Sequence, residues 1–107
     1  FPRGIDDDVD ERQVRPEKYY WFEHAERNAI YNAARIGVSL RDTTMYLTCG
    51  IPCSDCARGI ISSGVIRIYC KGKDTTRNRQ HWDEHALRSK QMFEESGVEV
   101  IFYDENL

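Results

Sequence analysis

Segments with the apolar spacing of a helix alternate along this chain with short segments rich in β-branched and aromatic residues. Such alternation favours strands that pair in parallel and are joined by right-handed helical crossovers. A glycine directly follows each helical segment and is a natural end for it. The expected elements are helices over 25–36, 54–63 and 81–96 and strands over 43–49, 65–70 and 98–103. We therefore predict a single α/β domain over residues 1–107, with at least two parallel strands side by side.

The composition narrows the class of partners. The chain has 107 residues and a net charge of -3, which argues against binding long nucleic acid through charge alone. No apolar run approaches the roughly 20 residues that a membrane-spanning helix needs, so we expect no membrane partner. Residues 1–18 are polar, contain an acidic run and lack periodicity, and they predict a solvated loop.

Two cysteines, Cys53 and Cys56, lie three positions apart at the start of a predicted helix, directly after Pro52. A structural disulfide, a redox pair and half of a metal site are three interpretations of such a pair. Four cysteines without a secretory signal favour a reducing compartment, and therefore a metal or redox motif. Since Ser54 and Asp55 separate the two thiols, and an acidic neighbour fits a redox motif poorly, we favour the metal.

A third ligand is available in His24, which opens the first predicted helix as His24-Ala25-Glu26. Two helix N-termini can meet at one ion, with His24 from one and the two cysteines from the other. Three protein ligands leave a fourth tetrahedral position open, which is the pattern of a catalytic zinc site. Glu26 could then carry protons between a water molecule and a substrate. Taken singly, His24 also fits a capping or core histidine, and Glu26 an acidic residue facing the helix dipole.

The motif His-x-Glu over 24–26, followed by Pro-Cys-x-x-Cys over 52–56, resembles the zinc-dependent cytidine and deoxycytidylate deaminase superfamily. With the segments 43–48 and 98–103, the chain is most similar to deoxycytidylate (dCMP) deaminases. This resemblance implies a three-layer α/β/α cytidine-deaminase-like fold with a mixed central sheet. It also implies that the N-terminal helix and first two strands of that fold are missing here, and that the loop over 48–52 is one residue longer than usual.

The function that the resemblance implies is hydrolytic deamination of a free cytosine nucleotide, with dCMP converted to dUMP and ammonia. It makes His24, Cys53 and Cys56 the ligands of Zn²⁺ and Glu26 the catalytic proton carrier for reaction at C4 of the ring. It further implies a cytoplasmic homo-oligomer, often a hexamer in this family. Two alternatives stay open, namely a deaminase of another nucleoside or base (cytidine, cytosine, guanine or tRNA adenosine) and a non-catalytic structural zinc module.

The two remaining cysteines, Cys49 and Cys70, end predicted strands and are expected to be small buried side chains. By resemblance to some phage dCMP deaminases, they could instead form a second, structural zinc site with His81 and His85. Otherwise these histidines lie on a solvated helix face, since they are four residues apart.

The aromatic run over 19–22 is expected to pack and to anchor the first helix, with stacking on a base or a subunit contact as the alternatives. Arg3 is a weaker candidate for contact with a substrate phosphate.

Overall fold

The structure, a computed structural model, describes residues 1–74 and 84–103. Helices α2 and α3 cover the predicted residues, whereas the strands are shorter than or shifted from their predicted ranges. Residues 81–83 of the third predicted helix lie outside the described residues. The elements are η1 (Asp10–Gln13, a 3-10 helix), α1 (Lys18–Trp21), α2 (Ala25–Ile36), β1 (Thr44–Tyr46), α3 (Ser54–Ser63), β2 (Arg67–Lys71), α4 (Glu84–Ser96) and β3 (Glu99–Tyr103).

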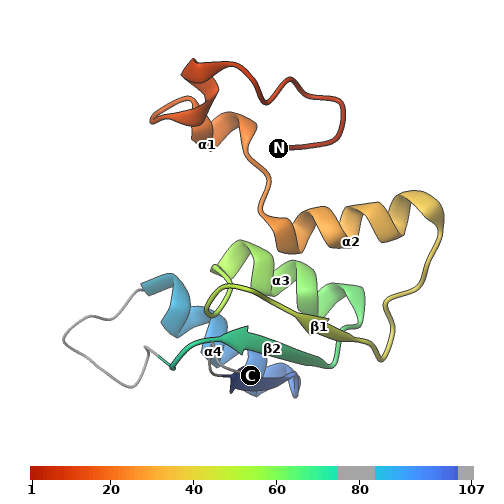
Figure 1. The fold of residues 1–107 in the computed structure, drawn as a ribbon. Coiled ribbons are helices and arrows are strands. Elements are labelled where there is room, and N and C mark those ends of the chain that lie inside the picture. The colour runs from red at the N-terminus through yellow and green to blue at the C-terminus, as the bar shows by residue number, and fades with distance from the viewer. Residues whose placement is uncertain (75–83, 104–107) are drawn as a thin grey trace.

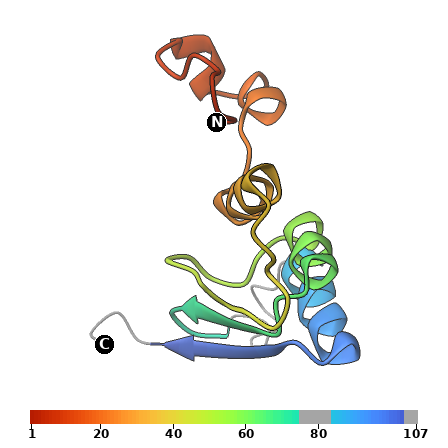
Figure 2. The ribbon, with the colours of Figure 1, turned by 90° about the vertical axis from the view of Figure 1, so that its right-hand side faces the viewer.

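The three strands form one sheet in the order β1-β2-β3, and both neighbouring pairs are parallel. Helices α3 and α4 connect successive strands and pack against each other on one face of the sheet (Figures 1 and 2). Helix α2 packs against α3, on the side of α3 that faces away from α4 (Figures 1 and 2). The predicted α/β class is confirmed. The small parallel sheet is consistent with the implied fold without its N-terminal helix and first two strands.

The core lies between the sheet and helices α3 and α4. Ile68 and Cys70 of β2, Ile60 of α3 and Phe93 of α4 are each 0% exposed. Residues 68 and 70 share a face because side chains alternate along a strand. Burying one large apolar side chain completely contributes about 1.5–3 kcal/mol. This packing fixes α3, the helix that follows the two motif cysteines, against the strands.

The other face of the sheet carries aromatic and charged side chains. Tyr46 and Tyr69 stack with their ring centroids 4.7 Å apart, and Tyr46 is 74% exposed. On the same face, Arg67 of β2 forms an ion pair of 3.0 Å with Glu99 of β3. None of the described helices combines the length and apolar character needed to cross a membrane.

The N-terminal segment, residues 1–22, stands apart from the sheet and reaches α2 through a short extended connection (Figures 1 and 2). The solvated loop predicted over 1–18 is only partly right, because η1 forms within it. The guanidinium of Arg12 lies 3.9 Å from the ring centroid of Trp21, which ties η1 to α1. A helical element of four residues is too short to show periodicity in a sequence.

The packing predicted for the aromatic run over 19–22 is wrong for three of its four side chains. Tyr19, Tyr20 and Phe22 are 62%, 80% and 41% exposed. Phe22 contacts the ring of Phe1, with centroids 4.3 Å apart, rather than the core. These rings face outward because their segment lies beyond α2, away from the apolar layer between helices and sheet. Stacking on a base or contact with a subunit stays a prediction.

Candidate metal centre and active site

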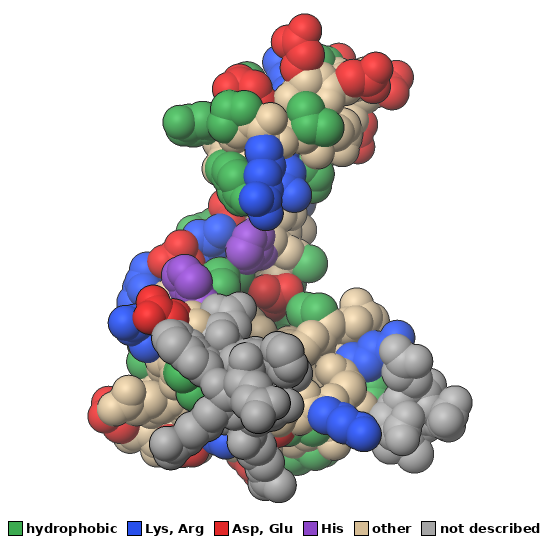
Figure 3. Space-filling model, turned by 90° about the vertical axis from the view of Figure 1, so that its left-hand side faces the viewer, with side chains coloured by type: hydrophobic (Ala, Val, Ile, Leu, Met, Phe, Trp, Pro, Cys, Tyr) green, Lys and Arg blue, Asp and Glu red, His purple; other side chains and the backbone are tan. Residues whose placement is uncertain are grey.

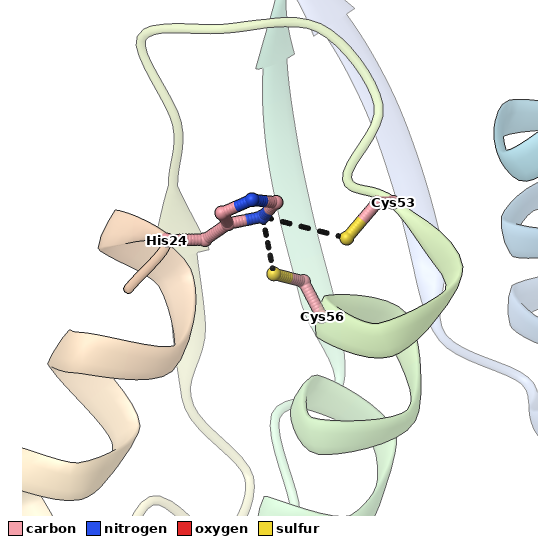
Figure 4. A group of neighbouring side chains, drawn as sticks. All are labelled: His24, Cys53 and Cys56. Carbon is pink, nitrogen blue, oxygen red and sulfur yellow. Dashed lines mark hydrogen bonds between the residues drawn. The ribbon is translucent and has the colours of Figure 1, made fainter. Parts of the chain in front are cut away.

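Each of the three predicted ligands lies at or near the N-terminus of a helix. His24 caps α2 and Cys53 caps α3, both with extended backbone angles, and Cys56 is the third residue of α3. Neither capping side chain hydrogen-bonds to its own helix, so both are free to point outward. Because α2 packs against α3, the two helix starts meet (Figure 4).

The geometry of these side chains fits a tetrahedral zinc ion. Nδ1 of His24 lies 3.4 Å from Sγ of Cys53 and 3.3 Å from Sγ of Cys56. All three donor atoms lie within 4.8 Å of one another. Zinc bonds of about 2.3 Å to sulfur and 2.0 Å to nitrogen would place neighbouring tetrahedral donors roughly 3.5 Å apart. The three side chains could therefore hold Zn²⁺, and the cysteines are free rather than paired as a disulfide.

The solvent exposure of the three side chains decreases from His24 to Cys56. His24 is exposed, Cys53 is half-buried and Cys56 is 0% exposed. Burial raises the pKa of the Cys56 thiol, and the neighbouring Cys53 and Glu26 raise it further. A bound cation acts in the opposite direction, since zinc takes thiolates as ligands. The open side of the site is therefore the histidine side.

Glu26 lies beside the ligands without being one of them. It is the second residue of α2 and is 8% exposed, which is unusual for a carboxylate. The thiol of Cys49 donates a hydrogen bond to Oε1 of Glu26 over 3.8 Å. Partial desolvation of the Cys49 thiol by the atoms around it and the charge of the Glu26 carboxylate both raise the pKa of Cys49, so the thiol keeps its proton and remains a donor. A buried carboxylate held beside a metal site is suited to proton transfer.

Arg27 lies next in the chain and adds positive charge near the cysteines. Burial acts to lower the pKa of Arg27, but the charges of Glu23, Cys56 and Cys53 outweigh it and raise the pKa. Its Nε lies 2.6 Å from Oε1 of Glu23, one helical turn earlier. This cation favours negative charge on the two thiols, as a zinc site requires.

The predicted second zinc site does not assemble among the described residues. His85 instead places Nδ1 at 2.8 Å from the hydroxyl of Ser54, between the two motif cysteines. Cys70 is buried as predicted, and burial raises its pKa to about 12. Cys49 is exposed, contrary to its predicted burial, because it lies in the loop after β1. His81 lies outside the described residues.

A comparison with protein families decides the class of this site. Residues 9–71 match the family model described as the cytidine and deoxycytidylate deaminase zinc-binding region. The chain belongs to the cytidine and deoxycytidylate deaminase family. The matched region includes both motifs of the cluster, so zinc is the metal for this deaminase family member.

Relatives of this chain carry related names. An uncharacterized deaminase from the luxG 3′ region of Aliivibrio fischeri is 37% identical over 104 residues, which cover 95% of this chain and 65% of that protein. Deoxycytidylate deaminases of Enterobacteria phages T2 and T4 are each 43% identical over 79 residues, or 73% of this chain. The chain spans 37% of the T2 protein and 36% of the T4 protein. It therefore covers about a third to two-thirds of the length of these relatives.

Sequence reasoning located the three side chains of the cluster but missed the contacts around them. The Cys49–Glu26 hydrogen bond joins residues 23 positions apart, and the Ser54–His85 contact joins residues 31 positions apart. For Cys49, a signal was present, since it stands in the loop over 48–52 that is one residue longer than usual. The sequence contains no comparable signal for the contact between His85 and Ser54.

Proposed function

We propose that this deaminase family member hydrolyses the exocyclic amine of a cytosine nucleotide, with dCMP as its preferred substrate and dUMP and ammonia as products. The observation that carries the proposal is the buried carboxylate of Glu26 beside a three-donor metal cluster. The two phage relatives named deoxycytidylate deaminase support the choice of substrate.

In this proposal, His24, Cys53 and Cys56 hold the metal. Zinc bound there would supply Lewis acidity, which makes water a better nucleophile near neutral pH. Glu26 would take a proton from the attacking water and deliver it to N3 of the ring. Once the oxygen of the water is bonded to C4, Glu26 would take the second proton from that hydroxyl and pass it to the amine, so that the bond from C4 to nitrogen breaks, ammonia leaves and C4 becomes a carbonyl. The Cys49 thiol would hold the carboxylate in place throughout.

Two rival functions lead to different expectations. A deaminase of another nucleoside or base would use the same chemistry with a different specificity. A structural zinc module would need no buried carboxylate and would favour a fourth protein ligand. Three donors converge in the described part of the chain, which leaves one tetrahedral position for a non-protein ligand and favours catalysis.

The test is turnover by the zinc-loaded protein, followed by the ultraviolet change that accompanies loss of the cytosine amine. The substrates dCMP, deoxycytidine, cytidine and cytosine are compared at equal concentrations, with the chelated protein as control. Preferred turnover of dCMP is the expected result. Preferred turnover of another substrate would keep the reaction and change the specificity. A protein with one bound zinc per chain and no turnover of any substrate would contradict the proposal.

The assembly and the location belong to the same proposal. We expect a homo-oligomer in the cytoplasm. Light scattering on the purified protein measures the mass of the assembly, and a monomer at micromolar concentration would contradict this part.

A further inference from the structure

A cavity of about 520 Å³ lies between the N-terminal segment and the first turns of α2 and α3. This volume is within the range of about 300–1,000 Å³ that is typical of small-molecule sites. His24, one of the three metal-binding side chains, forms part of its wall. The cavity therefore adjoins the candidate metal centre on its histidine side.

The wall of this cavity is rich in cations. Arg15, Lys18 and Arg27 line it, against the single carboxylate of Asp55. That carboxylate is paired with Arg58, and this contact lowers the pKa of Asp55. Figure 3 shows Lys and Arg side chains gathered where the N-terminal segment joins the rest of the molecule, next to a histidine. The cavity thus carries excess positive charge in a chain whose net charge is -3.

Two of these cations, Arg15 and Lys18, are not neutralised by a carboxylate of the described residues. Arg27 is paired with Glu23, but neither Arg15 nor Lys18 forms an ion pair with a carboxylate of the described residues. Both are instead drawn to the ring of Tyr19, with Cζ of Arg15 at 5.4 Å and Nζ of Lys18 at 5.8 Å from its centroid. Tyr19 and Phe22 add apolar wall to the same cavity.

We propose that Arg15 and Lys18 form a subsite for the 5′-phosphate of the substrate and so select a nucleotide over a nucleoside. The inference rests on the proposed deaminase function and adds the residues that determine its substrate class. A phosphate monoester is the ligand that two unpaired cations favour, because charge-assisted hydrogen bonds to phosphate are among the strongest polar contacts. The aromatic wall formed by Tyr19 and Phe22 suits the sugar and the base, which lie between the phosphate and the metal.

The test compares two substrates that differ only by the phosphate, dCMP and deoxycytidine, in the zinc-loaded protein. In the double variant Arg15→Ala, Lys18→Ala, we expect kcat/KM for dCMP to fall between about 10-fold and 100-fold for each cation removed. Turnover of deoxycytidine should stay within about threefold, because no charge-assisted contact to it is lost. Equal losses for both substrates, or an unchanged ratio between them, would overturn the subsite.

Arg12→Ala is the matched control. Arg12 lies in the same segment and also stacks on an aromatic ring, that of Trp21, but it does not line the cavity. We expect it to leave the ratio between dCMP and deoxycytidine unchanged. If it lowered the ratio as much as the double variant does, the effect would come from the fold of the segment, and the subsite would be refuted. Zinc content and thermal unfolding confirm that each variant is folded.

Binding measurements separate this inference from the proposed function. If the wild-type protein turned over neither substrate, the deaminase proposal would fail, and calorimetric titration with dCMP would test the subsite alone. Binding that is lost in the double variant would support the phosphate contact, and equal binding would refute it.

A cytosine-containing oligonucleotide serves as the last comparison. If it were deaminated in preference to dCMP, and this depended on Arg15 and Lys18, the cavity would be a strand-binding site and the proposal would be overturned.

Discussion

Replacing Glu26 with glutamine tests the proposed proton transfer most directly. The side chain is 8% exposed, and glutamine has nearly the same volume, so the substitution opens no cavity. The amide oxygen can still accept the hydrogen bond from Cys49. We therefore expect the free energy of unfolding to change by less than about 1 kcal/mol. Zinc binding should also be kept, since Glu26 is not one of the three ligands.

The rate should respond very differently from the stability. An amide cannot take up and deliver a proton, and a positioned acid–base group contributes about 10²–10⁴-fold to a rate. The expected loss in kcat corresponds to about 2.7–5.4 kcal/mol in activation free energy. The assay is the deamination of dCMP, measured beside the zinc content and the thermal unfolding of the same preparation.

Glu23→Gln is the matched control for this experiment. It makes the same chemical change one residue before His24, where the carboxylate pairs with Arg27 at 2.6 Å. A partly exposed ion pair contributes about 0–1 kcal/mol to stability, so the variant should stay folded. Because Glu23 takes no part in the proposed proton transfer, the loss in kcat should stay within about fivefold. If Glu26→Gln retained more than about a tenth of the wild-type kcat with one zinc per chain, proton transfer would not pass through Glu26.

Two further predictions concern stability. Gly64→Ala should lower the free energy of unfolding by about 1–3 kcal/mol, because φ is 95° and a Cβ would lie 2.9 Å from Cα of Arg41. In Gly72→Ala, φ is also 95°, but no atom of the described residues other than its chain neighbours lies within 4 Å of the added Cβ. Denaturant titration should therefore show a smaller loss, and equal losses would contradict the steric argument. Burial raises the pKa of Cys70 from 9.0 to about 12, so its thiol keeps its proton in the folded state while the unfolded chain ionises. This group should therefore leave the free energy of unfolding unaffected below about pH 9. Between about pH 9 and pH 12, the free energy of unfolding should fall by up to about 1.4 kcal/mol per pH unit. In Cys70→Val, unfolding measured at the same pH values should show a shallower fall in this free energy. Identical slopes for the two proteins would refute this reasoning.

Local sequence patterns were sufficient to predict two of the helices and to indicate the side chains of the candidate metal centre. The apolar spacing over 25–36 and 54–63 predicted α2 and α3 to the residue, because helical periodicity depends on neighbours a few positions away. The spacing of Cys53 and Cys56 placed both thiols at one helix start for the same reason. The two motifs together then indicated one metal site, although 29 residues separate His24 from Cys53.

The sequence by itself could not determine how far side chains near the motifs are exposed. The aromatic run over 19–22 has the composition of a core segment, and Cys49 that of a strand end. Three of the four aromatic side chains and Cys49 are exposed, because exposure depends on what the rest of the chain places over a residue rather than on the residue itself.

The sequence determined the α/β class and the alternation of elements, and it indicated the three side chains of the candidate metal centre and the neighbouring Glu26, since these depend on residue types in short motifs. The tertiary structure decided what surrounds them. It placed Cys49 against Glu26 and His85 against Ser54, and it put Arg15 and Lys18 in the wall of the cavity that His24 shares. These contacts depend on how α2, α3, α4 and the N-terminal segment lie relative to one another. Such packing arises from the whole apolar core, and no short segment of the sequence carries it.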